Sequence, residues 1–166
     1  WMQTFAKLNP KDKRAIDFKA HPDYILEILN REKKYEIKTL EFNSKASDFG
    51  GTILNGELYF SSARNYVRKN YGWNEEPFLD ILQADVTNNN GVKKIENDIF
   101  ILADNVNTYY HEASVAITND GKTIYFTRDN VNKRNRLDYG KDGTTHLKIY
   151  RASLDNGNWA DIEDLS

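Results

Sequence analysis

The chain has 166 residues and a net charge of −2, with 23 basic and 25 acidic residues. This length is enough for one hydrophobic core of ordinary size, and the balanced charge argues against nucleic acid as a partner. The chain contains no cysteine, which excludes disulfides and thiolate metal sites. It also contains no apolar run long enough to span a membrane.

Residues 1–34 are predicted to be helical. Apolar residues recur at helical spacing from Trp1 to Leu8, and Pro10 ends this first helix. Pro22 suits the first turn of a second helix, whose apolar face is formed by Tyr24, Ile25, Ile28 and Leu29. Residues 35–42 are then predicted to form a strand, in the place of the last strand of a preceding unit.

From residue 47 onward the sequence repeats itself after about 66 residues. Three pairs of segments align, namely Asn55-Gly56 with Asp120-Gly121, Tyr59-Phe60 with Tyr125-Phe126, and residues 78–84 with residues 146–152. A repeated unit that cannot bury its own apolar face stacks on its neighbours. The repeat therefore predicts an architecture built from similar, stacked units.

Each copy has the alternating pattern of four short strands with turn residues between them. The predicted strands are residues 50–54, 57–63, 78–84 and 92–96 in the first copy, and 113–118, 123–128, 147–153 and 159–162 in the second. Repeated units of four antiparallel strands are typical of β-propeller blades. The predicted fold is mainly β, with a helical segment at 1–34 and a partial β-propeller at 35–166, whose two blades span about 47–98 and 111–166.

The repeat is longer than common propeller blades, which have about 40–50 residues. The additional residues lie between the second and third strands of both copies, as insertions 65–77 and 129–145, which we expect on one side of the propeller. A closed ring needs about four to eight blades. We therefore expect the chain to belong to a longer protein that supplies the remaining blades, and to be unstable as an isolated monomer.

The second copy resembles TolB-type, WD40-like propeller repeats. The residues that carry this resemblance are Glu112-Ala113-Ser114, residues 119–127 and residues 147–152.

The order of motifs along the whole chain resembles the OmpA-family peptidoglycan-associated outer-membrane proteins of the Bacteroidota type. Leu8-Asn9-Pro10 with Asp12 resembles the end of a tetratricopeptide repeat. Four further motifs follow in the family's order, namely Asn43-Ser44, Ser47-Asp48-Phe49-Gly50, residues 59–64 and residues 73–80.

This family implies a lipoprotein on the periplasmic side of the outer membrane. Its members have tetratricopeptide helices, a propeller, a small β-sandwich and a C-terminal OmpA-like domain that grips peptidoglycan, and some belong to the type IX secretion and gliding motility machinery. The sequence contains neither the anchor cysteine nor the OmpA-like domain. The resemblance thus implies peptidoglycan binding only through an absent C-terminal domain, and it supplies no catalytic residues.

His111-Glu112 could serve as an acid–base pair or as part of a metal site. No second histidine follows four residues later, so the metalloprotease helix pattern fails. We interpret the pair as hydrogen bonding that links one blade to the next. Residues 138–143 contain two carboxylates near glycine without calcium-loop spacing, which favours a solvated turn. No catalytic residue, metal or cofactor is predicted.

The two insertions are the candidate partner-binding segments. The first is rich in aromatic residues, which either pack under a neighbouring element or form a contact surface. The second is basic and either binds an anionic polymer or an acidic partner or is a solvated loop. The predicted partner-binding residues are Tyr66, Tyr71, Trp73, Phe78, Arg128, Arg134 and Arg136.

These observations predict a non-enzymatic scaffold that docks other envelope proteins, because no nucleophile–base–acid set is visible and the preceding segment resembles a helical repeat. Two alternatives remain. One is a carbohydrate-binding propeller, in which Trp73, Tyr71 and Tyr110 stack on sugar rings. The other is a propeller attached to a hydrolase.

Overall fold

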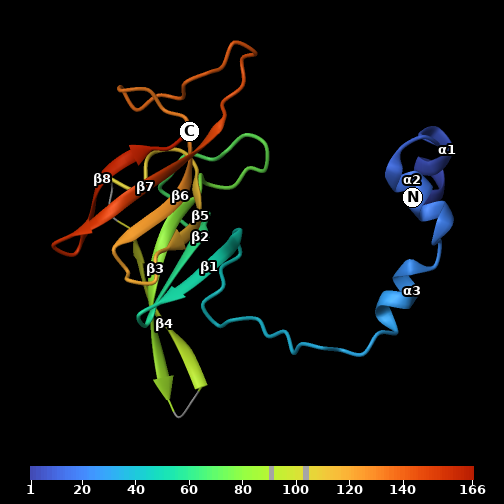
Figure 1. Ribbon diagram of the computed structural model, residues 1–166, viewed down its shortest axis with the longest axis horizontal. Helices are drawn as coiled ribbons and strands as arrows, with labels where there is room; N and C mark the ends of the chain where they lie inside the picture. The colour runs from blue at the N-terminus through green and yellow to red at the C-terminus, as the bar shows by residue number, and fades with distance from the viewer. Residues whose placement is uncertain (90–91, 103–104) are drawn as a thin grey trace. The chain divides into compact units, whose positions relative to one another are not determined.

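The computed structural model describes residues 1–89, 92–102 and 105–166. The chain separates into two units (Figure 1): Trp1–Thr39 holds the helices and Leu40–Ser166 holds the strands. No helix of the described residues is long and apolar enough to cross a membrane.

Three short helices occupy the first unit: α1 (Met2–Leu8), α2 (Lys13–Ala20) and α3 (Tyr24–Leu29). Helices α1 and α2 pack through small residues, Ala6 and Ala15, which are buried. Helix α2 lies within the segment predicted to be helical but between the two helices placed from the sequence, and Asp12 caps it by accepting a hydrogen bond from the backbone N–H of Arg14. The predicted strand at 35–42 is wrong: these residues pair with no strand among the described residues. Residues with high β-propensity form a strand only where a neighbouring strand is available to pair with them.

Two four-stranded antiparallel sheets make up the second unit, each ordered as its strands follow along the chain. The first sheet contains β1 (Asp48–Leu54), β2 (Glu57–Ser62), β3 (Asp80–Asn89) and β4 (Val92–Ile101). The second contains β5 (Glu112–Ile117), β6 (Thr123–Asp129), β7 (Leu147–Asp155) and β8 (Asn158–Asp164).

All eight predicted strands overlap these strands of the described residues, which confirms the mainly β fold and the four-strand pattern. Strands β3 and β4 are longer than predicted and continue as a hairpin beyond the rest of their sheet (Figure 1). The turn of this hairpin at Asn90 and Gly91 lies outside the described residues. The turn between β1 and β2 has positive φ at both Asn55 and Gly56, 51° and 86°, as a type I′ hairpin requires.

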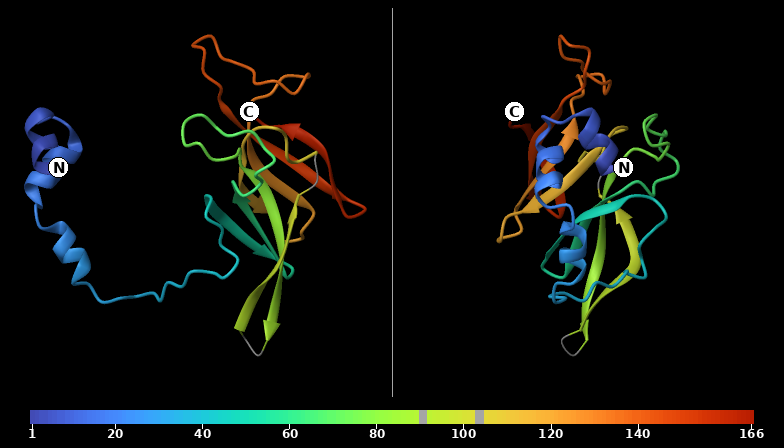
Figure 2. Two further views of the ribbon diagram at one scale, coloured as in Figure 1. Left: turned by 180° about the vertical axis from the view of Figure 1, so that it is seen from behind. Right: turned by 90° about the vertical axis from the view of Figure 1, so that its right-hand side faces the viewer.

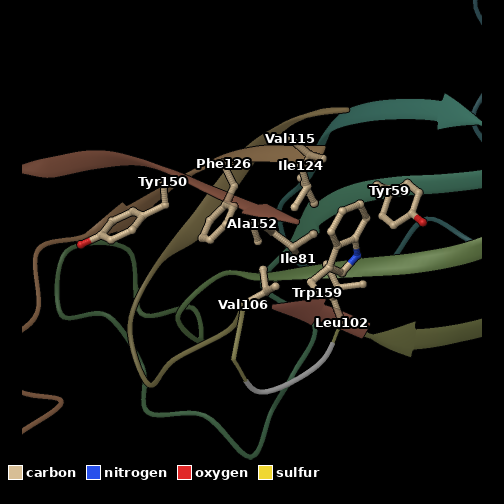
Figure 3. Packing of buried hydrophobic residues seen from close by; sticks show 10 residues of the cluster. All are labelled: Tyr59, Ile81, Leu102, Val106, Val115, Ile124, Phe126, Tyr150, Ala152 and Trp159. Atoms are coloured by element: carbon tan, nitrogen blue, oxygen red, sulfur yellow. The ribbon is translucent and has the colours of Figure 1, made fainter. Parts of the chain in front are cut away.

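The main core lies between the two sheets, and Figure 3 shows its side chains. The first sheet contributes Tyr59 and Ile81, and Leu102 and Val106 come from the end of that sheet and the connection to the next. The second sheet contributes Val115, Ile124, Phe126, Tyr150, Ala152 and Trp159.

The two sheets contact each other through different faces. We call the side that carries Tyr59 in the first sheet, and its repeat equivalent Tyr125 in the second, the front face; the opposite side is the back face. The front face of the first sheet covers the back face of the second, where Ile124 and Phe126 lie. The back face of the first sheet forms a smaller cluster of Leu58, Phe60, Leu82 and Ala84, with Phe42 packed against it.

Because alternate residues of a strand face opposite sides of the sheet, one aromatic residue of each aligned pair is expected to be buried. This holds in the second copy, where Phe126 is buried and Tyr125 is 36% exposed. In the first copy both Tyr59 and Phe60 are buried, because the second sheet covers one face and Phe42 covers part of the other.

Hydrogen bonds between the two sheets reinforce the packing. The side-chain amide of Asn107, in the connection between the sheets, binds both backbone groups of Ile81: Oδ1 accepts from its N–H at 2.7 Å and Nδ2 donates to its carbonyl at 2.9 Å. Thr52 Oγ1 donates to the carbonyl of Val115 at 2.9 Å. Because such buried polar groups are costly to leave unpaired, these bonds fix how the sheets dock.

Candidate functional site

A groove of about 520 Å³ lies where both insertions leave the sheets. The insertion 65–77 follows β2 and the insertion 129–145 follows β6, and Figure 2 shows both as loops beyond the strand ends. The wall of the groove is formed by both loops, by the first residues of β1 and β5, and by the segment that leads into β7. The lining includes Ser47, Phe49, Tyr71, Trp73, Glu76, His111, Asp129 and Leu147.

The aromatic insertion is divided between packing and exposure. The ring centroids of Tyr71 and Phe78 lie 4.7 and 4.6 Å from that of His111, so these two residues pack the loop onto the start of the second sheet. In contrast, Tyr66 and Trp73 are 69% and 85% exposed. Trp73 thus remains accessible on the wall of the groove, while Phe78 is largely a packing residue outside it.

Backbone contacts hold Trp73 at the tip of a closed loop. Asn70 and Pro77 form an isolated antiparallel bridge. Inside this bridge the N–H of Tyr71 donates to the carbonyl of Glu76 at 2.7 Å, and the N–H of Glu75 donates to the carbonyl of Tyr71 at 2.9 Å. The tryptophan is therefore presented by an ordered turn, which lowers the entropy cost of using it in binding.

Two carboxylates line the groove. Glu76 Oε2 accepts from Ser47 Oγ at 2.6 Å, and Asp129 Oδ2 accepts from the backbone N–H of His111 at 3.2 Å. No lysine or arginine of the described residues lines the groove. Burial lowers the pKa of His111, against a smaller opposite effect of Asp129, so its imidazole is neutral near pH 7. The groove consequently carries negative charge.

His111 and Glu112 connect the two sheets, as predicted for this pair. The backbone N–H of Leu79 donates to His111 Nδ1 at 3.1 Å, and the backbone N–H of Glu112 donates to the carbonyl of Leu79 at 3.0 Å. Because Nδ1 is the acceptor, the proton of the neutral ring resides on Nε2. This use of the histidine is structural.

Arg128, one of the predicted partner-binding residues, is buried in the structure and is not exposed as a contact surface would require. Its Nε lies 3.3 Å from Glu112 Oε1, and its guanidinium donates to the carbonyls of Asn105 and Val106. Along β6, Ile124, Phe126 and Arg128 occupy alternate positions and so share the back face. The alternation of the strand thus directs the arginine into the core.

The carboxyl group of Glu112 is fully buried beside this arginine. Burial raises its pKa to about 7, although a hydrogen bond from Thr108 Oγ1 at 2.6 Å favours the ionised form. Its Oε2 has no hydrogen-bond partner among the described residues. A partly unsatisfied carboxyl of this kind is sensitive to pH.

The first copy contains a similar network that sequence reasoning missed. Asp48 accepts from Ser44 Oγ at 2.8 Å and from the guanidinium of Arg64 at 2.9 Å. A signal for it was present in the sequence, since a hydroxyl residue precedes the carboxylate by four positions in both copies: Ser44 before Asp48, and Thr108 before Glu112. The repeated network is a structural element at the start of each sheet.

The remaining predicted site residues lie outside the groove. Tyr66, Arg134 and Arg136 are exposed on the loops and do not line it. Tyr110 packs against Phe78, with ring centroids 5.5 Å apart, and lies outside the groove as well. The structure therefore does not bring Tyr110 together with Trp73 as a platform for sugar rings.

The acidic turn at 138–143 closes on itself. Asp142 Oδ1 accepts from the backbone N–H and the hydroxyl of Thr144, at 3.1 and 2.8 Å. Within residues 1–89, 92–102 and 105–166, no group of three or more His, Cys, Asp or Glu side chains could hold a metal ion.

Comparisons of the chain with protein-family models, with curated proteins and with solved structures give no significant match.

Proposed function

We propose that the two sheets are consecutive blades of a β-propeller, and that this propeller is a non-enzymatic scaffold that docks other proteins. The observation that carries the proposal is the unequal burial of repeat-equivalent residues. On the first front face, Tyr59 and Ile81 are 6% and 0% exposed beneath the second sheet. Their equivalents on the second front face, Tyr125 and Ile149, are 36% and 53% exposed. A third, similar sheet would cover them.

One asparagine precedes each sheet, Asn43 the first and Asn107 the second, and this pair supports the same arrangement. Asn107 clamps the backbone of Ile81 in the first sheet. Its repeat equivalent, Asn43, is exposed at the back face of the first sheet, close to Phe42 and Phe60, and its side chain has no hydrogen-bond partner among the described residues. In a propeller, Asn43 would clamp the third strand of a preceding blade in the same way.

The contact between the sheets joins two different surfaces, a front face and a back face. Such a heterologous contact leaves one unused copy of each surface, so that it either continues as an array or closes as a ring. A ring of blades satisfies both free faces of the pair.

A scaffold fits the groove better than an enzyme does. His111, the basic side chain that lines the groove, has its Nδ1 bonded to the backbone of Leu79. The hydroxyl of Ser47 donates to Glu76 Oε2, which also accepts from the side-chain amide of Asn74 at 3.4 Å, and no histidine of the described residues hydrogen-bonds to this group as a catalytic base would. The exposed Trp73 on an ordered turn is instead typical of interface hot spots.

The order of sequence motifs extends the proposal to a location. We propose that the protein faces the periplasm at the outer membrane, where its partners are other envelope proteins such as those of type IX secretion or gliding. Peptidoglycan binding would belong to a separate C-terminal domain. A carbohydrate-binding propeller is the less supported alternative, because Tyr110 lies outside the groove and Tyr71 is partly committed to packing on His111.

Cysteine labelling tests the blade arrangement, because the chain has no native cysteine. Single variants Tyr125→Cys and Ile149→Cys would be made in the proposed longer protein, freed of any other cysteine, with the exposed Lys122→Cys as the control. We expect maleimide to modify position 122 rapidly and positions 125 and 149 slowly, because a further blade covers them. Equal labelling at all three positions would refute the propeller.

Photo-crosslinking tests the scaffold. A photoreactive amino acid placed at Trp73 in living cells should yield one discrete crosslinked protein, identified by mass spectrometry. The same group at Lys122, in the β5–β6 turn at the other end of the strands, serves as the control. The absence of a crosslinked product at position 73, or the same products at both positions, would count against a scaffold that uses this groove.

A further inference from the structure

The charge of the groove identifies the chemistry of its occupant. Among the described residues, the hydrogen bonds to the Glu76 carboxylate end on Oε2, and the hydrogen bond to the Asp129 carboxylate ends on Oδ2. One oxygen of each carboxylate is thus available to a ligand. Since no lysine or arginine of the described residues lines the groove, a partner that covered it without supplying a cation would bury uncompensated charge, which is costly.

Large apolar side chains stand beside these carboxylates. Trp73, Phe49 and Leu147 all line the groove and are 85%, 46% and 62% exposed. An indole ring this accessible can stack on a guanidinium or ammonium group, and the two other side chains can receive apolar residues. The combination suits a basic side chain with apolar neighbours.

The backbone beside the groove favours an extended chain. Phe49 belongs to β1, and Ala113 and Ser114 in β5 also line the groove. Each of these strands is the terminal strand of its sheet and pairs with one other strand among the described residues. In β5 the N–H of Ser114 already donates to Ser61 Oγ and the carbonyl of Val115 accepts from Thr52, so a peptide would use the other backbone groups of these two edges. Edge strands offer backbone donors and acceptors to an extended peptide, a mode of recognition that sugars cannot use.

We propose that this groove binds an extended segment of a partner protein, with a lysine or arginine directed to Glu76 and Asp129 and apolar residues placed against Trp73, Phe49 and Leu147. The inference rests on the proposed scaffold function and names the partner chemistry at the same site. It assigns the two carboxylates to specificity and Trp73 to affinity.

Peptide binding to the whole chain tests this inference. The probes are acetyl-Gly-Val-Leu-Arg-Val-Leu-Gly-amide and the same peptide with citrulline, which is neutral and nearly the same shape, in place of arginine. By titration calorimetry we expect the arginine peptide to bind about tenfold more tightly than the citrulline peptide, as charged hydrogen bonds in a partly covered site allow. Raising the salt concentration should reduce this preference.

Variants assign the effect to the groove. Glu76→Gln and Asp129→Asn should each reduce the preference for arginine several-fold. Glu75→Gln removes the same charge from the neighbouring residue, which does not line the groove, and should leave the preference unchanged. Trp73→Ala should weaken the binding of both peptides. Because Trp73 is exposed, the melting temperature of this variant should match that of the wild type. That variant keeps the test valid if Asp129→Asn disturbs the His111 contact.

Three results would overturn the inference. These are equal binding of the two peptides, an equal loss of preference in Glu75→Gln and Glu76→Gln, and binding of tri-N-acetylchitotriose that depends on Trp73 when neither peptide binds. Crosslinking at position 73 distinguishes this failure from that of the scaffold: a discrete partner without arginine preference refutes only the inference. Arginine preference without any partner in cells refutes the proposed function.

Discussion

The sheets β1–β4 and β5–β8 share one sequence pattern and one strand order but differ in what covers them. The front face is closed in the first sheet and open in the second, so that Ile81 is 0% and Ile149 is 53% exposed. The buried carboxylates differ too: Glu112 is paired inside the core, whereas Asp48 is paired with Arg64 at a partly exposed edge. Position in the array, more than residue type, therefore decides which residues are core.

The largest expected effect comes from truncating the two equivalent isoleucines. Ile81→Ala should lower the free energy of unfolding by about 3 kcal/mol, because it leaves a cavity between the sheets. Ile149→Ala should change it by no more than about 0.5 kcal/mol, as exposed sites usually do. Urea denaturation of both variants measures the difference. Similar losses would show that both front faces are covered in solution.

The buried ion pair of Glu112 and Arg128 should make the free energy of unfolding depend on pH. Because the pKa of Glu112 is raised by folding from 4.5 to about 7, the folded state binds its proton more tightly than the unfolded state. The resulting stability is fully present below pH 4.5 and is lost as the pH rises through 7, by at most about 3 kcal/mol.

Glu112→Gln isolates this contribution. His111 acts in the opposite sense, since its lowered pKa favours folding as the pH rises, so only the difference between wild type and variant reports on Glu112. We expect that difference to change between pH 4.5 and 7 in thermal melts. A difference that is constant over this range would mean that Glu112 stays ionised. Asp48→Asn should not produce the same change.

The two equivalent asparagines, Asn107 and Asn43, allow a second paired comparison, with a smaller expected change in the free energy of unfolding. Asn107→Ala removes the partners of the Ile81 N–H and carbonyl and should cost about 2 kcal/mol, because buried backbone groups are left unsatisfied. Asn43→Ala should cost almost nothing in residues 1–166, where the side chain is exposed. If a longer chain supplies the proposed preceding blade, Asn43→Ala should become as costly as Asn107→Ala. Chemical denaturation of residues 1–166, and of a chain extended by the proposed preceding blade, checks both expectations.

Within the aromatic insertion the expected effects are smallest. Phe78→Ala should destabilise the chain by about 1–2 kcal/mol, because its ring packs on Tyr110 and His111. Trp73→Ala should lie within about 0.5 kcal/mol of the wild type. Melting curves test both, and a large loss in Trp73→Ala would place this ring in a core. Trp73 alone is thus the variant that probes binding without disturbing the fold.

The strand pattern could be predicted from sequence because alternation and turn residues are local properties. The alternation along β6 also held the information that Arg128 points inward with Ile124 and Phe126, but this arginine was grouped with the exposed arginines of the following loop. The predicted strand at 35–42 failed for a different reason, since its β-forming residues have no sheet edge to join among the described residues.

The groove could not have been predicted from either copy alone. Glu76 and Asp129 are separated by more than fifty residues in the sequence and line one surface only because the two sheets stack. The division of the aromatic insertion also depends on that stacking, because His111 in the second copy is what Tyr71 and Phe78 pack against. Local patterns predict elements, and contacts between the copies create the site.

The Asn107 clamp also sets an order of events during folding. The backbone of Ile81 that receives the amide belongs to β3, which is synthesised before the connection that carries Asn107. During synthesis from the N-terminus, each sheet can thus be captured by one that has already formed. We therefore expect the first sheet to act as the template for the second, so that a defect in the first sheet impairs the docking of the second.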